Sequence, residues 1–276
     1  MIVGFIGAGN MGGTIMKSAF QCGFLKPYET MVYDVNESAM KELGEQFPIT
    51  VAQSNTQLAK ECECIVLAIK PIFMRGVLDE IQKYVRNKRI ISIAAGWTME
   101  MLTDALGKDN GSQVLRVMPN MPALIGAGFT ALCEETSFTK PMIKWAKELF
   151  SYLGTVQILP ERLFDAVVAV SGSSPAYVFM MIEAMADGAV KLGMPRSLAI
   201  QAAAQAVLGS AKMVLDTNEH PASLKDKVCS PGGTTIEAVE VLEKGGFRGL
   251  MMEAMDVCAQ KNRRMAAASA QDRRKC

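Results

Sequence analysis

The feature that most constrains the fold of this chain is a glycine-rich turn near its N-terminus. An apolar segment, residues 2–6, runs directly into Gly7-Ala8-Gly9-Asn10-Met11-Gly12, and helical periodicity follows over residues 11–23. A strand, three glycines at this spacing and a helix are typical of a dinucleotide-binding βαβ unit. The first glycine permits the tight turn, the second lets the backbone approach a pyrophosphate, and the third lets helix and strand pack closely. We therefore expect a nicotinamide dinucleotide here; the alternative is a glycine-rich turn in an unrelated α/β fold.

The alternation of strands and helices continues through the first 160 residues. We expect strands at residues 30–33, 64–69, 90–93, 114–118, 129–133 and 155–158, and helices at residues 38–46, 57–61, 73–85, 99–106 and 141–153. Strands separated by helices of this length predict a Rossmann-like, doubly wound, mostly parallel sheet. The fold class is therefore α/β at the N-terminus, with residues 1–160 as the dinucleotide-binding domain.

From residue 161 the strand pattern ends and long helices follow, at residues 175–192, 195–214, 234–244 and 247–268. In the first of these helices the charged residues Glu183, Asp187 and Lys191 are spaced four apart and form one narrow stripe. A helix that is apolar on nearly all other sides must be buried on most of them. Because so few helices cannot cover such surfaces alone, we expect a second copy of the chain to complete the core. Residues 161–276 are thus predicted to be an all-α dimerisation and substrate-binding domain.

Composition restricts the kinds of binding partner and the cellular location that we expect for this chain. The 276-residue chain has a net charge of +1, which favours neither nucleic acid nor an anionic membrane. It shows no basic leader and no uninterrupted apolar run of the roughly 20 residues that a membrane helix needs. Seven cysteines and the lone His220 fit neither a disulfide framework nor a metal site, so we expect a cytoplasmic protein with reduced thiols and no metal. His220 is expected to be a surface loop residue.

Asp34 ends the second predicted strand and bears on the choice of coenzyme. An acidic residue at this position accepts hydrogen bonds from the adenosine ribose hydroxyls and repels a 2′-phosphate. The residues that follow, Val35, Asn36 and Glu37, include no arginine. This argues for NADH over NADPH; the alternative is that Asp34 caps the helix that begins near Ser38.

Three further strands end in residues that could face the coenzyme. Lys70 follows the strand at 64–69 and could lie near the nicotinamide or a substrate anion, or could be a solvated loop lysine. Ala94-Ala95-Gly96 could let the coenzyme lie close, or could form a plain tight turn. Asn120, between Pro119 and Met121, could hydrogen-bond within the cleft or belong to a purely structural turn.

A second glycine motif, Ser230-Pro231-Gly232-Gly233-Thr234-Thr235, precedes the predicted helix at 234–244. Two glycines expose consecutive backbone amides at a helix N-terminus, where a carboxylate is favoured, and the flanking hydroxyls add donors. From the residues alone, a helix cap with a Pro-Gly turn is the favoured interpretation of the motif.

These motifs together resemble the pyrroline-5-carboxylate reductase family over essentially the whole chain. They are Gly4-Phe5-Ile6-Gly7-Ala8-Gly9-Asn10-Met11-Gly12, Lys70-Pro71, Met118-Pro119-Asn120, Ser171-Gly172-Ser173-Ser174-Pro175-Ala176-Tyr177, and Leu224-Lys225-Asp226 through Thr235. The Ser-Pro-Gly-Gly-Thr-Thr block is the most specific piece, since the N-terminal glycines alone would fit many reductases.

The resemblance implies NAD(P)H-dependent reduction of the cyclic imine 1-pyrroline-5-carboxylate to L-proline, the final step of proline biosynthesis. It also implies a homodimer, or a larger assembly of dimers, with the site completed between subunits. Within the motif the resemblance assigns the substrate carboxylate to Ser230, Gly232, Gly233 and Thr234, and the ring nitrogen to Thr235. Two departures from the family pattern stand out: Ser174 where glycine is frequent, and Asp34 where NADPH-using members have a small polar residue.

We predict the following site. The catalytic residues are Thr235 and Lys70. The coenzyme is NADH, with NADPH as the second choice, and is bound by Ile6, Gly7, Ala8, Gly9, Asn10, Met11, Gly12, Asp34, Asn55, Ala68, Ile69, Lys70, Ala94, Ala95, Gly96 and Asn120.

Two other functions compete with this prediction. A hydroxyacid dehydrogenase of the 6-phosphogluconate type also joins a dinucleotide domain to helices, but it needs an acid/base lysine on an early helix of the second domain. Residues 171–185 contain no lysine. A non-catalytic NAD(H)-sensing regulator needs no carboxylate loop, and residues 230–235 would then be unexplained.

Overall fold

The computed structural model describes residues 1–271, with side chains described as far as residue 268. It forms two compact units. Unit 1 consists of Met1–Gly172 together with the chain from Cys258 onward, and unit 2 is Ser173–Val257. The expected domains 1–160 and 161–276 follow the change from strands to helices along the sequence, whereas the compact units divide the chain at Ser173 and again after Val257.

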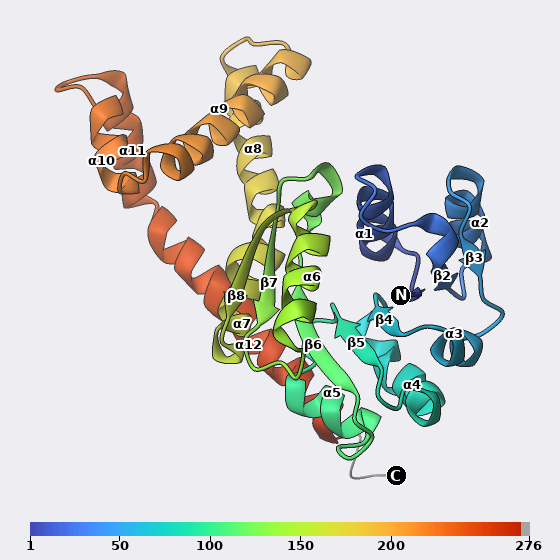
Figure 1. Cartoon of the computed structure of the whole chain (residues 1–276). Helices are drawn as coiled ribbons and strands as arrows, with labels where there is room; N and C mark the ends of the chain where they lie inside the picture. Colours follow the sequence, from blue (N-terminus) through green and yellow to red (C-terminus); the bar gives the residue numbers. More distant parts are fainter. Residues whose placement is uncertain (272–276) are drawn as a thin grey trace. The chain divides into compact units, whose positions relative to one another are not determined.

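Unit 1 is built on one eight-stranded sheet with the strand order β3-β2-β1-β4-β5-β6-β7-β8 (Figure 1). The strands are β1 (Val3–Ile6), β2 (Thr30–Tyr33), β3 (Thr50–Val51), β4 (Cys64–Leu67), β5 (Arg89–Ser92), β6 (Gln113–Met118), β7 (Gly128–Cys133) and β8 (Gly154–Leu159). All neighbours pair in parallel except β6 and β7, which are antiparallel. The sheet is the doubly wound, mostly parallel sheet that the sequence predicts, and its order reverses beside β1, where such sheets bind ligands.

Helices cover both faces of this sheet. One core contains apolar side chains of α1 (Asn10–Gln21), α2 (Glu37–Gln46) and α6 (Lys140–Ser151). The other contains those of α3 (Asn55–Glu61), α4 (Pro71–Ile81), α5 (Met99–Leu106) and α7 (Phe164–Val167). The strands serve both cores because successive side chains point to opposite faces: Val66 belongs to the first core and Ile65 to the second.

Unit 2 is helical. It contains α8 (Ser174–Lys191), α9 (Arg196–Thr217), α10 (Pro221–Val228), α11 (Thr234–Lys244) and the first part of α12 (Phe247–Gln271), whose remainder belongs to unit 1. Helix α10 was not expected from the sequence. His220 is its N-cap, and the Nδ1 of His220 accepts a hydrogen bond of 3.2 Å from the Ala222 N–H. The expected surface histidine is exposed, and it begins a helix rather than lying in a loop.

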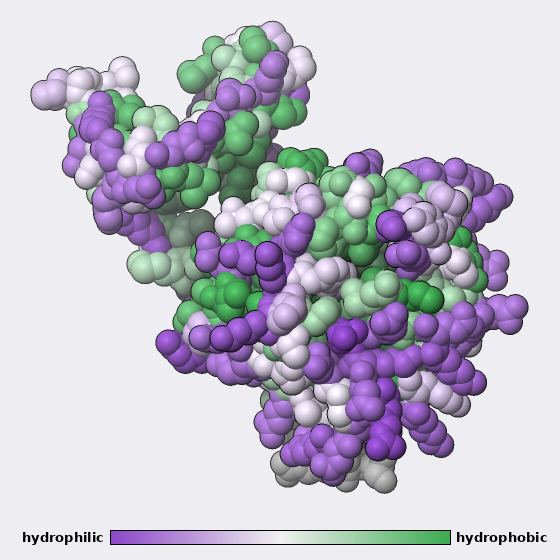
Figure 2. Space-filling view, viewed as in Figure 1, coloured by the Kyte–Doolittle hydropathy of each residue, from purple (hydrophilic) through white to green (hydrophobic). Residues whose placement is uncertain are grey.

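Helices α8 and α9 pack against each other but leave most of their apolar surface uncovered. In α8, all of whose residues are described, Ala186 alone is buried, and in α9 only Ala199 and Ala203 are. Figure 2 shows apolar residues at the surface of these helices. By length and composition the segments Glu161–Lys191 and Arg196–Thr217 could each cross a membrane, and only 28% and 11% of their most apolar windows are buried. Surfaces this apolar require a covering partner.

Candidate active site

The glycine turn has the geometry that its sequence predicts. Gly7 has φ +108°, and a Cβ there would lie 2.4 Å from the Ala68 carbonyl oxygen. A Cβ at Gly12 would lie 2.2 Å from the Gly7 carbonyl oxygen, so helix α1 can approach the turn only without a side chain there. At Gly9, by contrast, a Cβ would meet nothing within 4 Å. Gly9 is the N-cap of α1 and supplies no side-chain cap, so the first-turn amides face open space that suits a phosphate.

Asp34 is joined to this turn by hydrogen bonds. Its Oδ2 accepts a 2.6 Å hydrogen bond from the Ala8 N–H, and its Oδ1 accepts one of 2.9 Å from the Asn36 N–H. The cap of α2 is Asn36, whose Oδ1 accepts from the N–H groups of Ser38 and Ala39. The helix-capping role considered for Asp34 therefore belongs to Asn36.

Asp34 also borders a cavity of about 310 Å³ on the β2 side of the turn. This adenosine cavity, as we call it, is lined by Ile6, Gly7, Tyr33, Asp34, Val35, Asn55, Ile69, Phe73, Gly76, Val77 and Glu80. Its walls are apolar side chains that could hold a flat base, and its charged groups are two carboxylates. Among the described residues that line it, none is lysine or arginine.

A second cavity, of about 500 Å³, is lined by Gly9 of the turn, shares Ile69 with the adenosine cavity, and lies at the carboxyl ends of β4 and β5. We call it the nicotinamide cavity. It is lined by Gly9, Asn10, Met11, Ala68, Ile69, Lys70, Pro71, Ile93, Ala94, Ala95 and Pro119. Lys70 is the exposed N-cap of α4, and the Trp97 Nε1–H donates a 3.2 Å hydrogen bond to the Pro71 carbonyl oxygen, which ties the start of α4 to the loop after β5. The two cavities and the turn between them match the two halves of a dinucleotide.

Two residues predicted to contact the coenzyme also have structural contacts. Gly96, at φ +73°, faces α12, where a Cβ would lie 3.4 Å from the Met265 Cβ. Asn120 bridges three segments, since its Nδ2 donates to the Ser171 carbonyl oxygen at 3.1 Å and its Oδ1 accepts from the Phe129 N–H at 2.9 Å. Neither residue lines the nicotinamide cavity.

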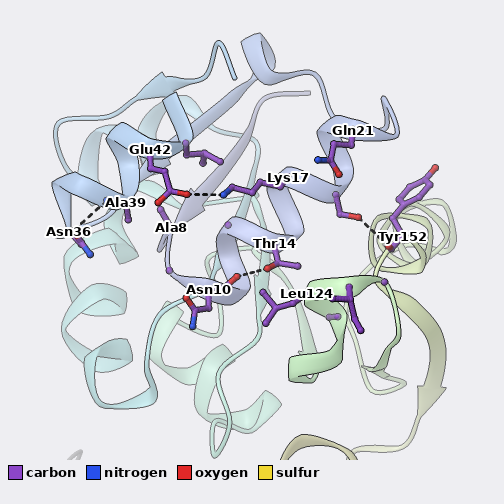
Figure 3. Close-up of a pocket in the computed structure, with 17 residues that line it drawn as sticks. Ala8, Asn10, Thr14, Lys17, Gln21, Asn36, Ala39, Glu42, Leu124 and Tyr152 are labelled. Carbon is purple, nitrogen blue, oxygen red and sulfur yellow. Dashed lines mark hydrogen bonds and ion pairs between the residues drawn. The ribbon is translucent and has the colours of Figure 1, made fainter. Parts of the chain in front are cut away.

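A third hollow, of about 650 Å³, separates α1 from α2 and from the 3₁₀ turn Met121–Ile125 (Figure 3). Lys17 on α1 and Glu42 on α2 form an ion pair of 3.1 Å across it, and the Thr14 hydroxyl donates to the Asn10 carbonyl oxygen at 2.6 Å. The ion pair joins α1 to α2, whereas the Thr14 hydrogen bond lies within the first turn of α1.

The predicted substrate residues lie in unit 2. Gly233 is the N-cap of α11 and supplies no side-chain cap, and its N–H donates to the Ser230 carbonyl oxygen at 3.0 Å. Gly232 has φ +66°, a conformation that favours glycine. A Cβ at Gly233 would lie 2.3 Å from the Ser230 Oγ, a hydroxyl that can rotate away, and 3.1 Å from the Ser230 carbonyl oxygen. Ser230 and Thr234 are exposed and Thr235 is half-buried. The loop thus offers backbone amides and hydroxyls at a helix N-terminus, as anion binding requires.

The buried thiols of Cys62 and Cys64 are poorly suited to act as nucleophiles. Burial raises the pKa of the Cys62 and Cys64 thiols to about 12, because the thiolate is disfavoured where it cannot be solvated. Within the described residues, no group of His, Cys, Asp and Glu is arranged to hold a metal ion.

Six residues of the adenosine cavity were not predicted from the sequence: Tyr33, Val35, Phe73, Gly76, Val77 and Glu80. Four of them lie on α4 at positions 73, 76, 77 and 80, spaced as one face of a helix. That face was available from the sequence, but only the structure shows that it lines a cavity together with Ile6 of β1 and Tyr33 of β2.

Comparison with known proteins agrees with this geometry. Residues 2–96 match the family model "NADP oxidoreductase coenzyme F420-dependent", and residues 161–265 match "Pyrroline-5-carboxylate reductase dimerisation". The pyrroline-5-carboxylate reductase of Escherichia coli is 46% identical over 96% of this chain and 98% of its own length. That of Methanosarcina acetivorans is 40% identical over 95% of this chain and 97% of its own length.

A solved structure, Plasmodium falciparum pyrroline carboxylate reductase with NADP bound, superposes with a TM-score of 0.87 at 30% identity. The match covers 96% of this chain and 97% of that one. With near-complete coverage in both directions, the Rossmann-like unit and the helical region are matched together rather than separately. The chain belongs to the pyrroline-5-carboxylate reductase family.

Proposed function

We propose that this protein reduces 1-pyrroline-5-carboxylate to L-proline in the cytoplasm, as the final step of proline biosynthesis. The observation that carries the proposal is the match to pyrroline-5-carboxylate reductases along nearly the whole chain. The geometry supports it, because unit 1 has an open helix N-terminus between two cavities and unit 2 has a glycine loop suited to a carboxylate. Residues 1–160 serve as the dinucleotide-binding domain, and residues 161–276 as the dimerisation and substrate-binding domain.

In this proposal the coenzyme and the residues have the following roles. A bound reduced nicotinamide supplies the hydride that the imine carbon receives. The glycine loop at Gly232 and Gly233, with the hydroxyls of Ser230 and Thr234, holds the substrate carboxylate at the start of α11. The Thr235 hydroxyl orients the ring nitrogen. Because an imine that binds already protonated needs no acid, the protein contributes orientation and charge placement.

Lys70 adds a positive charge at the nicotinamide cavity. It is the one ionisable side chain among the described residues that line that cavity. An ammonium there attracts the substrate carboxylate or the coenzyme phosphates, so its main effect is on binding.

NADH is the preferred coenzyme in this proposal. The adenosine cavity presents the carboxylates of Asp34 and Glu80 where a 2′-phosphate would need cations. A hydroxyl can donate to these oxygens, whereas a phosphate would face like charge. NADPH remains the second choice, since the glycine turn and the nicotinamide cavity serve both coenzymes.

The exposed apolar helices of unit 2 pack against a second copy of the chain. Both membrane-length segments overlap the stretch matched by the dimerisation family model. A homodimer or an assembly of dimers therefore covers them, with no membrane and, at net charge +1, no nucleic acid as partner.

Initial-rate measurements with 1-pyrroline-5-carboxylate and each coenzyme test the proposal. We expect coenzyme oxidation with proline as product, and a larger kcat/KM for NADH than for NADPH. Tight NADH binding without oxidation would favour the sensing regulator instead. A larger kcat/KM for NADPH would overturn the coenzyme preference while leaving the reaction intact.

A further inference from the structure

The nicotinamide cavity has two walls that begin where two neighbouring strands end. The α4 wall, as we call it, is residues 68–71, and the loop wall is residues 93–95 after β5. The paired register of β4 and β5 ends at Leu67 and Ser92, and one further hydrogen bond of 3.2 Å runs from the Ile93 N–H to the Leu67 carbonyl oxygen. Both walls continue beyond these bonds, so another contact must set the distance between them around the cavity.

Trp97 supplies a contact of this kind. Its Nε1–H donates a 3.2 Å hydrogen bond to the Pro71 carbonyl oxygen, and the side chain is only 2% exposed. A buried indole N–H needs an acceptor, because an unpaired donor loses its water without replacement. Pro71 is the first residue of α4 and follows the N-cap Lys70. The hydrogen bond therefore joins the chain just after the loop wall to the end of the α4 wall.

The loop that carries Trp97 is itself fixed on two sides. The Oγ of the buried Ser92 accepts a hydrogen bond of 3.3 Å from the Ala94 N–H. Gly96 packs against α12, where its Cβ would lie 3.4 Å from the Met265 Cβ and 3.6 Å from the Ala266 nitrogen. Because these contacts do not involve α4, loss of the Trp97 hydrogen bond would release the start of α4 rather than the loop.

The first turn of α4 has little other burial to hold it. Lys70 is exposed, and the side chains of Ile72 and Phe73 are 81% and 59% exposed. The first buried side chain of the helix is Met74. The Phe73 N–H donates to the Lys70 carbonyl oxygen at 3.0 Å, a bond that shapes the turn without attaching it to the sheet. The start of α4 thus depends on the Trp97 indole for its position.

We propose that Trp97 is a positioning residue for the nicotinamide half of the coenzyme. Through Pro71 it holds the α4 wall at a fixed distance from the loop wall, so that the ring takes one orientation between them. The proposal rests on the proposed function, since it takes a nicotinamide dinucleotide as the ligand. It deepens that function by assigning the shape of the cavity to a side chain that does not line it.

Equilibrium binding of two ligands to Trp97→Phe, measured by calorimetry without substrate, tests the proposal. Phenylalanine keeps an aromatic ring in the core but has no N–H. We expect the NADH dissociation constant to rise about twofold to tenfold, the loss of one hydrogen bond. ADP-ribose has the same adenosine, pyrophosphate and second ribose but no nicotinamide, so its dissociation constant should not change. An unchanged NADH affinity, or equal losses for both ligands, would overturn the proposal.

Trp145→Phe is the matched control, because the chain has two tryptophans and the chemical change is the same. Trp145 lies on α6, packs against Phe24 with ring centroids 5.6 Å apart, and lines none of the cavities described above. Trp145→Phe should leave the affinity for both ligands unchanged. Equal losses of NADH affinity in the two variants would show a general effect of core packing and contradict the proposal.

The wild-type protein supplies a measurement that needs no change at residue 97. With both tryptophans replaced by fluorotryptophan, which keeps the indole N–H, fluorine NMR should give one signal for each, and Trp145→Phe assigns them. NADH should shift the Trp97 signal more than ADP-ribose does and leave the Trp145 signal in place. Equal shifts of the Trp97 signal with the two ligands would contradict the proposal, even if Trp97→Phe failed to fold.

Steady-state kinetics separate positioning from stability. In Trp97→Phe the KM for NADH should rise and kcat should fall, because a ring that can tilt is less often aligned with the imine carbon. Both parameters should stay at the wild-type value in Trp145→Phe. An unchanged kcat/KM for NADH in Trp97→Phe would overturn the proposal.

The binding comparison is independent of the reaction. Wild-type turnover with 1-pyrroline-5-carboxylate is measured separately, and its absence would overturn the proposed function while the two ligands still decide the role of Trp97. If the wild type binds NADPH more tightly, NADPH and 2′-phospho-ADP-ribose form the corresponding pair of ligands, with the same expected and contradicting results.

Discussion

The carboxylate of Asp34 accepts a 2.6 Å hydrogen bond from the backbone N–H of Ala8. This contact joins the end of β2 to the glycine turn, the two elements that define the coenzyme site. Asp34 consequently has two roles that a substitution changes together. In the proposed function its charge acts on the coenzyme, and its oxygens fix the turn that would receive the pyrophosphate.

Replacing Asp34 by asparagine separates these roles. Asparagine keeps the shape and one oxygen that can accept from Ala8, but it removes the charge that opposes a 2′-phosphate. We expect the ratio of kcat/KM for NADH to that for NADPH to fall about tenfold in Asp34→Asn, or about 1.4 kcal/mol. Glu37→Gln, which removes a charge from the exposed first turn of α2, is the control. An equal fall in Glu37→Gln would mean that the net charge of the loop, not Asp34, sets the preference.

The close contact at Gly12 predicts a large loss from a small change. In Gly12→Ala the new methyl group would press on the Gly7 carbonyl oxygen, and backbone atoms cannot move aside as a flexible side chain can. We expect about 1–3 kcal/mol lower free energy of unfolding, with weakened NADH binding, as for other overpacked sites. Gly44→Ala is the counterpart, because a Cβ in that part of α2 meets nothing within 4 Å. It should raise the free energy of unfolding by about 0.4–1 kcal/mol. Urea titration of both variants measures the two effects. Equal effects in the two variants would contradict the steric argument.

The parts of the site that the sequence predicted are those whose chemistry is local. The glycine turn, its strand and its helix are adjacent residues, so their roles follow from spacing alone. The structural contacts of Asn120 and Gly96 could not be predicted in this way, because their partners Ser171 and Met265 lie far along the chain. The same limit hid the hydrogen bond from the Asn55 Nδ2 to the Glu80 Oε2, whose residues are 25 positions apart.

In the fold, too, local features were predicted from the sequence and non-local ones were not. Strands and helices with clear periodicity were predicted to within a few residues, whereas β3, with only two residues, and the short α10 were missed. The antiparallel step between β6 and β7 depends on a return of the chain that periodicity does not encode. The expected domain boundary at residue 161 followed the end of the strand pattern, but side chains beyond it pack into unit 1. Asp165, for example, accepts hydrogen bonds from Asn262 at 2.7 Å and from Arg263 at 2.8 Å.

Glu161 provides a stability test of this packing. Its Oε1 accepts from the Arg116 guanidinium at 2.8 Å and from the Met99 N–H at 2.7 Å, and the Arg116 side chain is only 5% exposed. Glu161→Ala leaves the buried Arg116 guanidinium without its ion-pair partner, so we expect a loss of about 3 kcal/mol in the free energy of unfolding. Glu161→Gln keeps an acceptor and should lose less. Glu148→Ala, on the exposed side of α6, should change stability by no more than about 0.5 kcal/mol. A loss that small in Glu161→Ala would show that residue 161 contributes nothing to unit 1.

The buried thiols predict a fall in stability at high pH. Burial raises the pKa of Cys64 from 9.0 to about 12, so the folded protein keeps a proton that the unfolded chain releases. This contribution is complete below pH 9 and is lost as the pH rises from about 9 towards 12. The free energy of unfolding should therefore decline over that range, and less steeply in Cys64→Ala than in the wild type. Cys22→Ala removes an exposed thiol and should leave the slope unchanged. Identical slopes in wild type and Cys64→Ala would refute the assignment.

The neighbouring hydroxyls of Thr234 and Thr235 allow substrate binding and turnover to be separated. Both residues begin α11, but the proposed roles differ: Thr234 holds the carboxylate and Thr235 orients the ring nitrogen. Valine has the shape of threonine without the hydroxyl. Thr235→Val should lower kcat on the order of a hundredfold, the scale seen when one positioned donor is removed, and leave the NADH dissociation constant unchanged. Thr234→Val should mainly raise the KM for 1-pyrroline-5-carboxylate, and Thr235→Ser should retain most of the turnover. Exchanged effects, with Thr234→Val losing kcat and Thr235→Val losing only KM, would reverse the two assignments, because only the group that orients the reacting C=N bond can act selectively on the transition state.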